Sequence, residues 1–192
     1  MQTDLANRQT KHLESIHEDF LQRQKKSLLA KCRRIAVVGP SPDPNSESYL
    51  SVEKFLGLGL EVIPVLPGCQ DYLGLPCYDR LRDVPGDVDI VQFYPRDGWN
   101  FPALARAAVG KGAKLFWVEG GTADPEIKEI LTAGGVQLVE HESLEEEFVT
   151  HFLFGLSAGV PGAGQREIGG RHERATAFFL RDGGGVERRT QG

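Results

Sequence analysis

Cysteine is scarce in this chain of 192 residues. The three cysteines, Cys32, Cys69 and Cys77, are odd in number and lack the spacing of metal ligands. They indicate neither a disulfide framework nor a zinc site, so we expect free, reduced thiols. Reduced thiols fit a cytoplasmic protein.

Long apolar runs and an excess of positive charge are also missing. No apolar stretch approaches the roughly 20 residues that a membrane span requires. The N-terminus, residues 1–5, lacks the basic region and apolar core of a signal peptide. The formal net charge of -5 gives no electrostatic reason to expect nucleic acid as a partner. We therefore expect a cytoplasmic protein with neither a membrane nor nucleic acid as its main partner.

The sequence has few residues arranged in patterns that are typical of catalytic sites. The five histidines have no metal-ligand spacing, and no Ser-His-Asp order with a nucleophile elbow is visible. His141, between Glu140 and Glu142, is the only histidine near a predicted strand end. It is a candidate base, but a solvated histidine in an acidic turn is the better interpretation. We expect no metal and no catalytic residue, which favours a protein that is not an enzyme.

Length and composition indicate one domain with appendages, because 40% of the residues are hydrophobic and 26% are charged. We expect an N-terminal helical arm over 1–33, a core over 34–154 and a Gly-rich, flexible tail over 155–192, with one weak hairpin or docking segment around Phe178 and Phe179. Helix-like spacing of apolar residues predicts a helix over 9–31. That helix is expected to pack on the domain, a second copy or a partner protein. A basic membrane-surface helix is the alternative, but its apolar face is thin.

Short β-rich runs alternate with helical segments through the core. This alternation predicts an α/β fold, a Rossmann-like doubly wound parallel sheet of about five strands. Asp124 before Pro125 reads as an N-cap, and Ser143 with Glu146 fits a capping box. The expected strands cover 35–38, 60–65, 89–94, 114–118 and 136–139, and the expected helices cover 46–58, 99–111, 124–133 and 143–154.

The turn after the first strand is a candidate phosphate site. Gly39 allows a tight turn and a close backbone approach, and the next helix supplies N–H donors at its N-terminus. Ser41, Asn45 and Ser46 add short hydrogen-bonding side chains. The alternative is an ordinary strand-to-helix turn in which Asn45 or Ser46 is the N-cap.

The second strand bears on the kind of nucleotide. A dinucleotide site usually has Asp or Glu at the end of that strand, where the carboxylate binds ribose hydroxyls. Here the strand ends in Pro64-Val-Leu-Pro67 with no acid. A carboxylate would repel a phosphate there, so its absence is compatible with a ribose 3'-phosphate or with a different pose of the ligand, and it makes NAD the less favoured ligand.

These segments together resemble the small bacterial CoA-binding domain proteins, whose fold is that of the CoA-binding domain of succinyl-CoA synthetase α-subunits. The resemblance covers roughly residues 28–148. It is carried, in order, by residues 35–45 with Ser48-Tyr49, by 61–68, by 73–85 with 88–91, by 112–118 and by 133–139.

The resemblance implies roles for residues at four strand ends. It implies a phosphate-binding turn and a border for the adenine or ribose. It also implies a phosphate-pairing arginine and a turn that faces the pantetheine or pyrophosphate. A solvent-facing arginine is the alternative for Arg96. The residues are Gly39, Pro40 and Ser41; Pro64, Val65, Leu66 and Pro67; Tyr94 and Arg96; and Glu119, Gly120 and Gly121.

Three positions depart from the family pattern. Ser143 stands where the family often has a cysteine, so a thiol role is absent there. Glu119 replaces a neutral Gln and would bring negative charge near an anionic ligand. The loop after the second strand has no lysine for a 3'-phosphate, and Lys54, Arg33 or Arg34 are the candidate substitutes.

The interpretation favoured by these residues is a CoA or acyl-CoA binding protein without catalysis. Two alternatives stay open. One is an NAD(P)-binding oxidoreductase or a ligase-like subunit, and the other is a regulatory module with a degenerate nucleotide site.

Overall fold

The computed structural model describes residues 2–96 and 98–157, and these form an α/β domain preceded by a helix. The tail predicted over 155–192, with its segment around Phe178, lies outside the described residues from 158 onward. The domain boundaries at 33 and 154 stay a prediction. The elements are α1 (Gln2–Lys31), β1 (Arg34–Val38), α2 (Glu47–Gly57), β2 (Glu61–Val65), β3 (Asp71–Tyr72), β4 (Leu75–Pro76), the 3-10 helix η1 (Leu81–Asp83), β5 (Ile90–Phe93), α3 (Phe101–Gly110), β6 (Leu115–Val118), α4 (Pro125–Ala133), β7 (Gln137–Glu140) and α5 (Leu144–Ser157).

The five predicted strands form one parallel sheet in the order β2-β1-β5-β6-β7. The fold class predicted from the sequence is therefore confirmed. Val38 is in register with both Val65 and Phe93, so the strands end together. Strand order reverses beside β1, and ligands of open parallel sheets bind at the carboxyl ends next to such a point.

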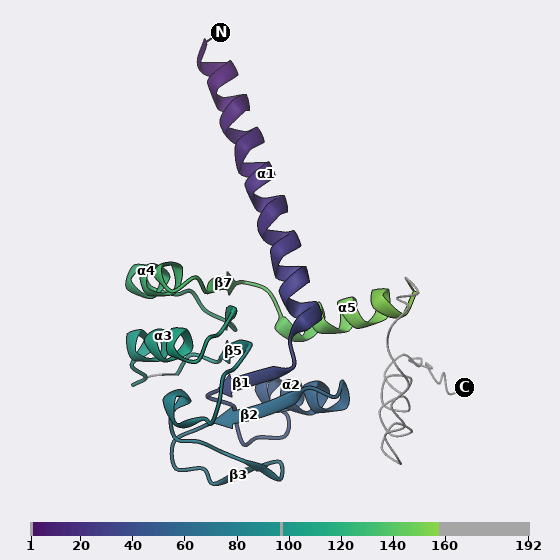
Figure 1. Ribbon diagram of the computed structural model, residues 1–192, viewed down its shortest axis with the longest axis vertical. Helices are drawn as coiled ribbons and strands as arrows, with labels where there is room; N and C mark the ends of the chain where they lie inside the picture. Colours follow the sequence, from purple (N-terminus) through teal and green to yellow (C-terminus); the bar gives the residue numbers. More distant parts are fainter. Residues whose placement is uncertain (1, 97, 158–192) are drawn as a thin grey trace, which may run out of the picture. The chain divides into compact units, whose positions relative to one another are not determined.

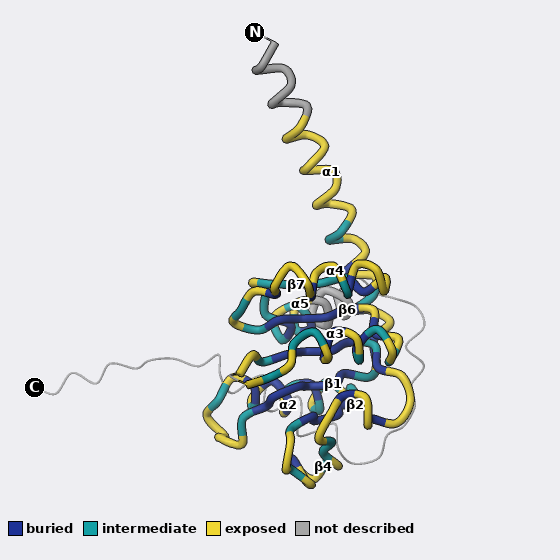
Figure 2. Tube along the Cα trace, turned by 90° about the vertical axis from the view of Figure 1, so that its left-hand side faces the viewer, coloured by how far each residue is buried: buried dark blue, intermediate teal, exposed yellow. Residues whose placement is uncertain are grey.

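Helices cover both faces of the sheet (Figure 1). Alternate residues of each strand point to opposite sides, so Ile35 and Val37 pack with α2 and α5, while Ala36 and Val38 pack with α3 and α4. Figure 2 shows the resulting burial of the strands. Apart from Gln92 in β5, both faces of the central strands are apolar, as a parallel sheet between two helical layers requires.

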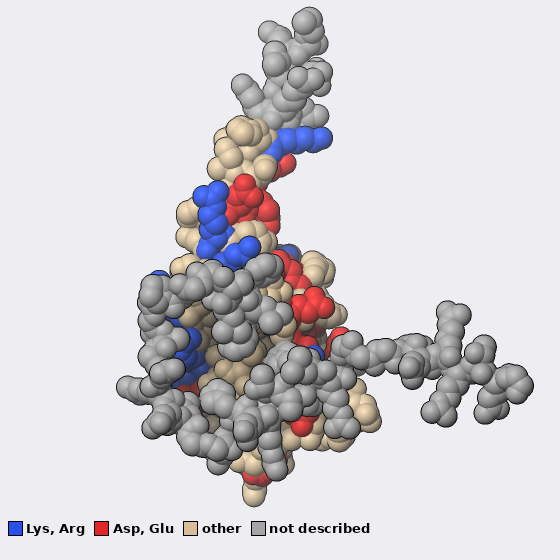
Figure 3. Space-filling model, turned by 90° about the vertical axis from the view of Figure 1, so that its right-hand side faces the viewer, with Lys and Arg blue, Asp and Glu red and all other residues tan. Residues whose placement is uncertain are grey.

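Helix α1 is tied to the domain near its C-terminal end. The Lys25 side chain is 2% exposed, pairs with Glu142, lies 3.4 Å from Glu147 and sits 5.7 Å from the ring centroid of Trp117. Residues 10–20 of α1 are exposed (Figure 2), and both acidic and basic side chains lie on the exposed part of the helix (Figure 3). The helix is longer than predicted, since it begins at Gln2 rather than at residue 9.

Local signals agree with most helix ends. Ser46 accepts a hydrogen bond from the Tyr49 N–H as the N-cap of α2, and the Ser143 hydroxyl accepts one from the Glu146 N–H. Asp124 is the N-cap of α4, as predicted; its backbone has cap geometry, and its side chain makes no capping hydrogen bond. Pro125 in the first turn removes one donor that a cap would otherwise serve.

Within the described residues, no helix has both the length and the hydropathy needed to span a membrane.

Candidate functional site

The turn after β1 has a backbone that only glycine fits well. Gly39 has φ of 78°, and a Cβ placed on it would lie 2.8 Å from the carbonyl oxygen of Tyr94. The same Cβ position is 3.8 Å from Nε of Arg96 and from the ring of Trp99. The structure therefore brings the turn after β1 and the segment after β5 into contact.

The donors of this turn are used within the protein. The Gly39 N–H donates to the Val65 carbonyl at 2.9 Å, and the Ser41 N–H donates to the Ser48 hydroxyl at 2.8 Å. Tyr72 donates its hydroxyl to the Ser41 carbonyl at 2.6 Å, and burial raises the pKa of that phenol to about 12. Ser41 is thus held from both sides, and the turn is rigid rather than open.

Side chains farther along the turn support its shape as well. The Asn45 N–H donates to the Asp43 carboxylate at 3.0 Å, and the Ser46 hydroxyl donates to the Asp43 carbonyl at 2.7 Å. Pro40 is buried and has no N–H to offer. In the described part of the chain, the N–H groups of Glu47 and Ser48 at the start of α2 have no acceptor. These two groups, rather than those of Gly39 and Ser41, are available to an anion.

The end of β2 divides the predicted residues into buried and accessible ones. Pro64 and Val65 are buried, and the Val65 side chain belongs to the core against α3. The Pro64 carbonyl accepts from the Tyr78 N–H at 3.1 Å. Leu66 is half-buried and Pro67 is exposed. Pro67 lines a cavity at this edge of the sheet.

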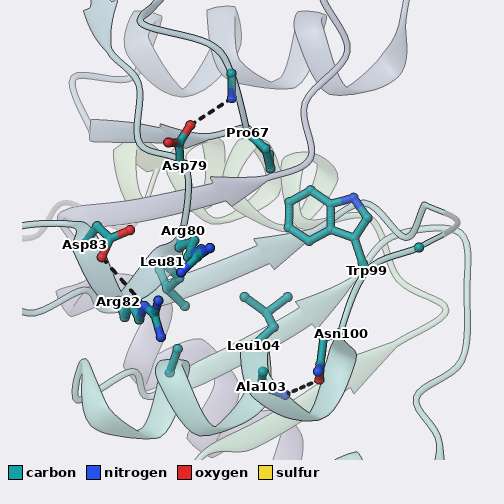
Figure 4. Close-up of a pocket in the computed structure, with 13 residues that line it drawn as sticks. Pro67, Asp79, Arg80, Leu81, Arg82, Asp83, Trp99, Asn100, Ala103 and Leu104 are labelled. Atoms are coloured by element: carbon teal, nitrogen blue, oxygen red, sulfur yellow. Dashed lines mark hydrogen bonds and ion pairs between the residues drawn. The ribbon is translucent and has the colours of Figure 1, made fainter.

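That cavity has a volume of about 910 Å³ and lies beyond the carboxyl ends of β2 and β5, beside α3 (Figure 4). Ligand pockets for drug-sized molecules usually have volumes of roughly 300–1,000 Å³. Pro67 and Trp99 form one side, and Asn100 caps α3 at its base by accepting from the Ala103 N–H at 2.9 Å. Figure 4 shows Arg80 and Arg82 on the opposite side.

Sequence reasoning missed most of this cavity wall. Arg80 and Arg82 lie in the connector after β4, and Trp99 lies just before α3. The only available signal was the charged run Asp79-Arg-Leu-Arg-Asp83, which sits within a segment that the family resemblance treats as a connector.

A polar network lies on the other face of the sheet at the same edge. The amide nitrogen of Gln92 is 2.8 Å from Glu119 Oε1, 3.0 Å from the Tyr94 hydroxyl and 3.3 Å from the Ser51 hydroxyl. Gln92 is fully buried, and its Oε1 has no hydrogen-bond partner among the described residues. Tyr94 thus directs its hydroxyl into the protein, and burial raises its pKa.

Glu119 points into this network rather than toward the loop surface. Its Oε1 also accepts from the Leu144 N–H at 3.2 Å, at the first residue of α5. Burial raises the pKa of Glu119, while the bonds from Gln92 and Leu144 act in the opposite direction. The negative charge is therefore turned toward donors inside the protein.

The glycines after Glu119 differ in their surroundings. Gly120 has φ of 65° and is exposed, and nothing lies within 4 Å of a Cβ placed on it. A Cβ on Gly121 would lie 3.2 Å from Cγ of Pro95. The loops after β5 and β6 therefore approach each other closely at Gly121.

The three cations proposed as substitutes for the missing lysine are placed elsewhere. Arg34 pairs with Glu61 at 2.8 Å and bonds to the carbonyls of Asp87 and Pro85, at the amino ends of the strands. Arg33 precedes it at that same end. Lys54 pairs with Glu145 of α5.

The remaining candidates lie outside the cavity wall. His141 is exposed with φ of 63°, as expected for a turn residue. Cys69 and Cys77 flank the β3-β4 hairpin and are half-buried, and Cys32 is buried. Among the described residues, no three His, Cys, Asp or Glu side chains gather as metal ligands would.

The fold and the cavity define a class: an open parallel α/β domain with a cavity at the carboxyl edge of its sheet, next to the point where strand order reverses. Residues 33–147 match the family model for the CoA binding domain, and the chain belongs to that family.

The chain is also similar to several proteins of known sequence or structure. The chain is 31% identical over 110 residues to the uncharacterized protein YneT of Bacillus subtilis (strain 168), which covers 57% of this chain and 81% of YneT. A hypothetical protein from Pyrococcus horikoshii OT3 is similar in structure, with a TM-score of 0.62, 25% identity and coverage of 68% of this chain and 91% of that one. A conserved hypothetical protein from Pyrococcus furiosus has a TM-score of 0.53, 32% identity and coverage of 60% and 98%.

Proposed function

We propose that this chain binds CoA or an acyl-CoA at the carboxyl edge of its sheet and performs no chemistry on it. The observation that carries the proposal is the cavity between Pro67 and Trp99, which adjoins the Gly39 turn in a member of the CoA binding domain family. Adenine suits the space beside the Trp99 ring because aromatic side chains stack on bases.

The diphosphate is assigned to the junction of the turn after β1 and the segment after β5. Arg96 is exposed and close to Gly39, so its guanidinium suits an anion bound there. The N–H groups of Glu47 and Ser48 lie at the start of α2, where the positive end of the helix dipole also favours a bound anion. The loop of Gly120 and Gly121 is the proposed path of the pantetheine.

Glu119 is compatible with this ligand because its carboxylate accepts hydrogen bonds inside the protein. The concern that it repels the anion is therefore weaker than the sequence implied.

The test is calorimetric titration of the full chain with CoA, acetyl-CoA, NAD and NADP. We expect saturable binding of CoA and acetyl-CoA, at least roughly tenfold tighter than binding of either dinucleotide. Tight binding of NAD with no heat from CoA would sink the proposal in favour of the oxidoreductase alternative. Mass spectrometry of small molecules released from natively purified protein would identify the acyl group.

A regulatory module with a degenerate nucleotide site is the second candidate. One observation favours it: the N–H groups of Gly39 and Ser41 donate to Val65 and Ser48 and are therefore not available to a phosphate. Absence of any co-purifying nucleotide, together with no heat from CoA and recovery of a partner protein, would support this candidate instead.

We also propose that α1 docks a second copy of the chain or a partner protein. Leu13, Ile16 and Phe20 are 66%, 52% and 55% exposed and follow one another at spacings of three and four residues. Such spacing places them on one helical face. Light scattering of the full chain and of a Leu13→Gln, Phe20→Gln variant tests a homodimer, which the double change should dissociate.

A further inference from the structure

CoA differs from most adenine nucleotides by a phosphate on the ribose 3' oxygen, and a site that selects CoA needs a cation for it. The ribose joins the adenine to the diphosphate, so this cation must lie beside the adenine space. In the proposed site, the adenine space is the cavity lined by Pro67 and Trp99.

We infer that Arg80 and Arg82 bind the ribose 3'-phosphate of CoA and so determine the selectivity of this site. The inference rests on the proposed function and names the residues that would distinguish CoA from its dephosphorylated form. Both arginines line the cavity, and Figure 4 shows their side chains directed toward the space in front of Trp99 and Leu104.

The backbone holds the two arginines firmly. Leu81, between them, is 2% exposed and belongs to the core cluster against α3. Arg80 precedes η1 in an extended conformation, and Arg82 lies in the middle of η1. The buried leucine therefore anchors the segment while the residues on both sides of it reach the cavity.

The charges of the two arginines are available. Within the described residues, Arg80 makes no ion pair, and Arg82 has only Asp83, with 3.7 Å between Nε and Oδ1. Those two side chains are 65% and 51% exposed, and exposed pairs contribute little, so a phosphate can compete for Arg82. Asp79 is engaged in accepting from the Gly68 N–H at 2.8 Å.

No other cation of the candidate set can take this role. Arg34 is held by Glu61 at the amino end of the sheet, where Arg33 also lies and donates to the Cys32 carbonyl at 2.7 Å. Lys54 is held by Glu145 on the opposite helical face. Arg96 lies at the Gly39 turn, where the diphosphate is assigned. The connector after β4 is thus where this chain supplies the positive charge that the loop after β2 lacks.

The experiment compares CoA with dephospho-CoA, and 3',5'-ADP with 5'-ADP, by calorimetry on the full chain. Hydrogen bonds to charged groups support a preference of roughly tenfold or more for each 3'-phosphorylated ligand. An Arg80→Ala, Arg82→Ala variant should lose that preference while binding dephospho-CoA as the wild type does. Arg80→Lys, Arg82→Lys should retain part of it. Arg23→Ala, Lys26→Ala, which also removes two positive charges but from exposed positions of α1, is the control and should change nothing.

Each result has one meaning. Equal affinity of the wild type for CoA and dephospho-CoA overturns the inference but leaves the proposed function standing. A preference that survives the double alanine change also overturns it. Binding of neither ligand overturns the proposed function itself. Tighter binding of NADP than of CoA, lost in the same variant, would reassign the arginines to a 2'-phosphate.

Discussion

Gly39 lies against Tyr94 so closely that a Cβ on Gly39 would be 2.8 Å from the Tyr94 carbonyl oxygen. The contact joins the turn after β1 to the segment after β5, and those two segments form the proposed diphosphate site. The position therefore combines a left-handed backbone with a steric limit.

We expect Gly39→Ala to destabilise the domain by about 2–4 kcal/mol, because the left-handed φ and the contact each add a cost. CoA binding should fall at least roughly tenfold. Urea denaturation and calorimetry are the measurements. Gly59→Ala is the matched control, since Gly59 has the same φ of 78° and no atom within 4 Å of an added Cβ. Equal losses in the two variants would show that the Tyr94 contact does not matter.

Glu119 should make stability depend on pH. Its pKa is raised by burial, so the folded state binds the proton more tightly than the unfolded state does. The free energy of unfolding should therefore fall as pH rises from the ordinary glutamate value of 4.5 through the raised folded value. Glu119→Gln should remove this decline and leave the variant relatively more stable at pH 7 than at pH 4.5. Thermal melts across that range are the measurement.

Glu140 is a control, because its effect on the free energy of unfolding should change with pH in the opposite direction to that of Glu119. Burial acts to raise its pKa, but the Ala123 N–H at 2.5 Å and Lys128 at 3.0 Å outweigh burial and lower it. Its contribution is present above the ordinary value and is lost as pH falls through the lowered one. Glu140→Gln should therefore narrow the gap to wild type at low pH, and matching profiles for the two variants would contradict both assignments.

Lys25 should be the strongest single tie between α1 and the domain. Lys25→Ala leaves Glu142 and Glu147, which are 33% and 29% exposed, without their cation and removes the contact with Trp117, so we expect a loss of about 1–3 kcal/mol. Lys25→Met keeps the packing of the stem and should lose less. Chemical denaturation measures both, and Lys26→Ala, an exposed neighbour, should stay near wild type.

The cysteines should differ in their reaction with iodoacetamide at pH 8. Burial raises the pKa of Cys32 and of Cys77 to about 12, and for Cys77 a hydrogen bond with Cys69 adds to the effect. Thiolate is the reactive form, so both residues should label slowly in the folded protein, and Cys32 should label only on unfolding. Peptide mass spectrometry gives the site of labelling. Equal rates for Cys32 in native and denatured protein would contradict the burial seen here.

The parallel sheet was predictable because its strands are apolar on both sides. Residues 35–38 and 114–118 stand out against the polar segments around them, and each is followed by a helix pattern. The CoA-binding family was also predictable from ordered segments. Which N–H groups of the Gly39 turn remain free was not, since the acceptors Val65 and Ser48 are fixed by tertiary packing.

The β3-β4 hairpin and the cavity wall left weaker signals. Two strands of two residues carry no periodicity, and the hairpin turn places Leu73 at φ of 56°, a conformation that leucine rarely adopts. Arg80 and Trp99 are separated by 18 residues of chain. They line the same cavity because the connector returns to the edge of β2, where Tyr78 bridges to Val65. The sequence pattern does not predict this return of the connector, because the return depends on tertiary contacts.

The segment that leads into α5 contacts two separate parts of the domain. Glu142 receives Lys25 from α1, and two residues later the Leu144 N–H donates to Glu119 at the ligand edge. A partner bound to α1 would therefore act on the same short stretch of backbone that orients Glu119. The backbone from Glu142 to Leu144 thus links the contact that anchors α1 to the hydrogen bond that orients Glu119.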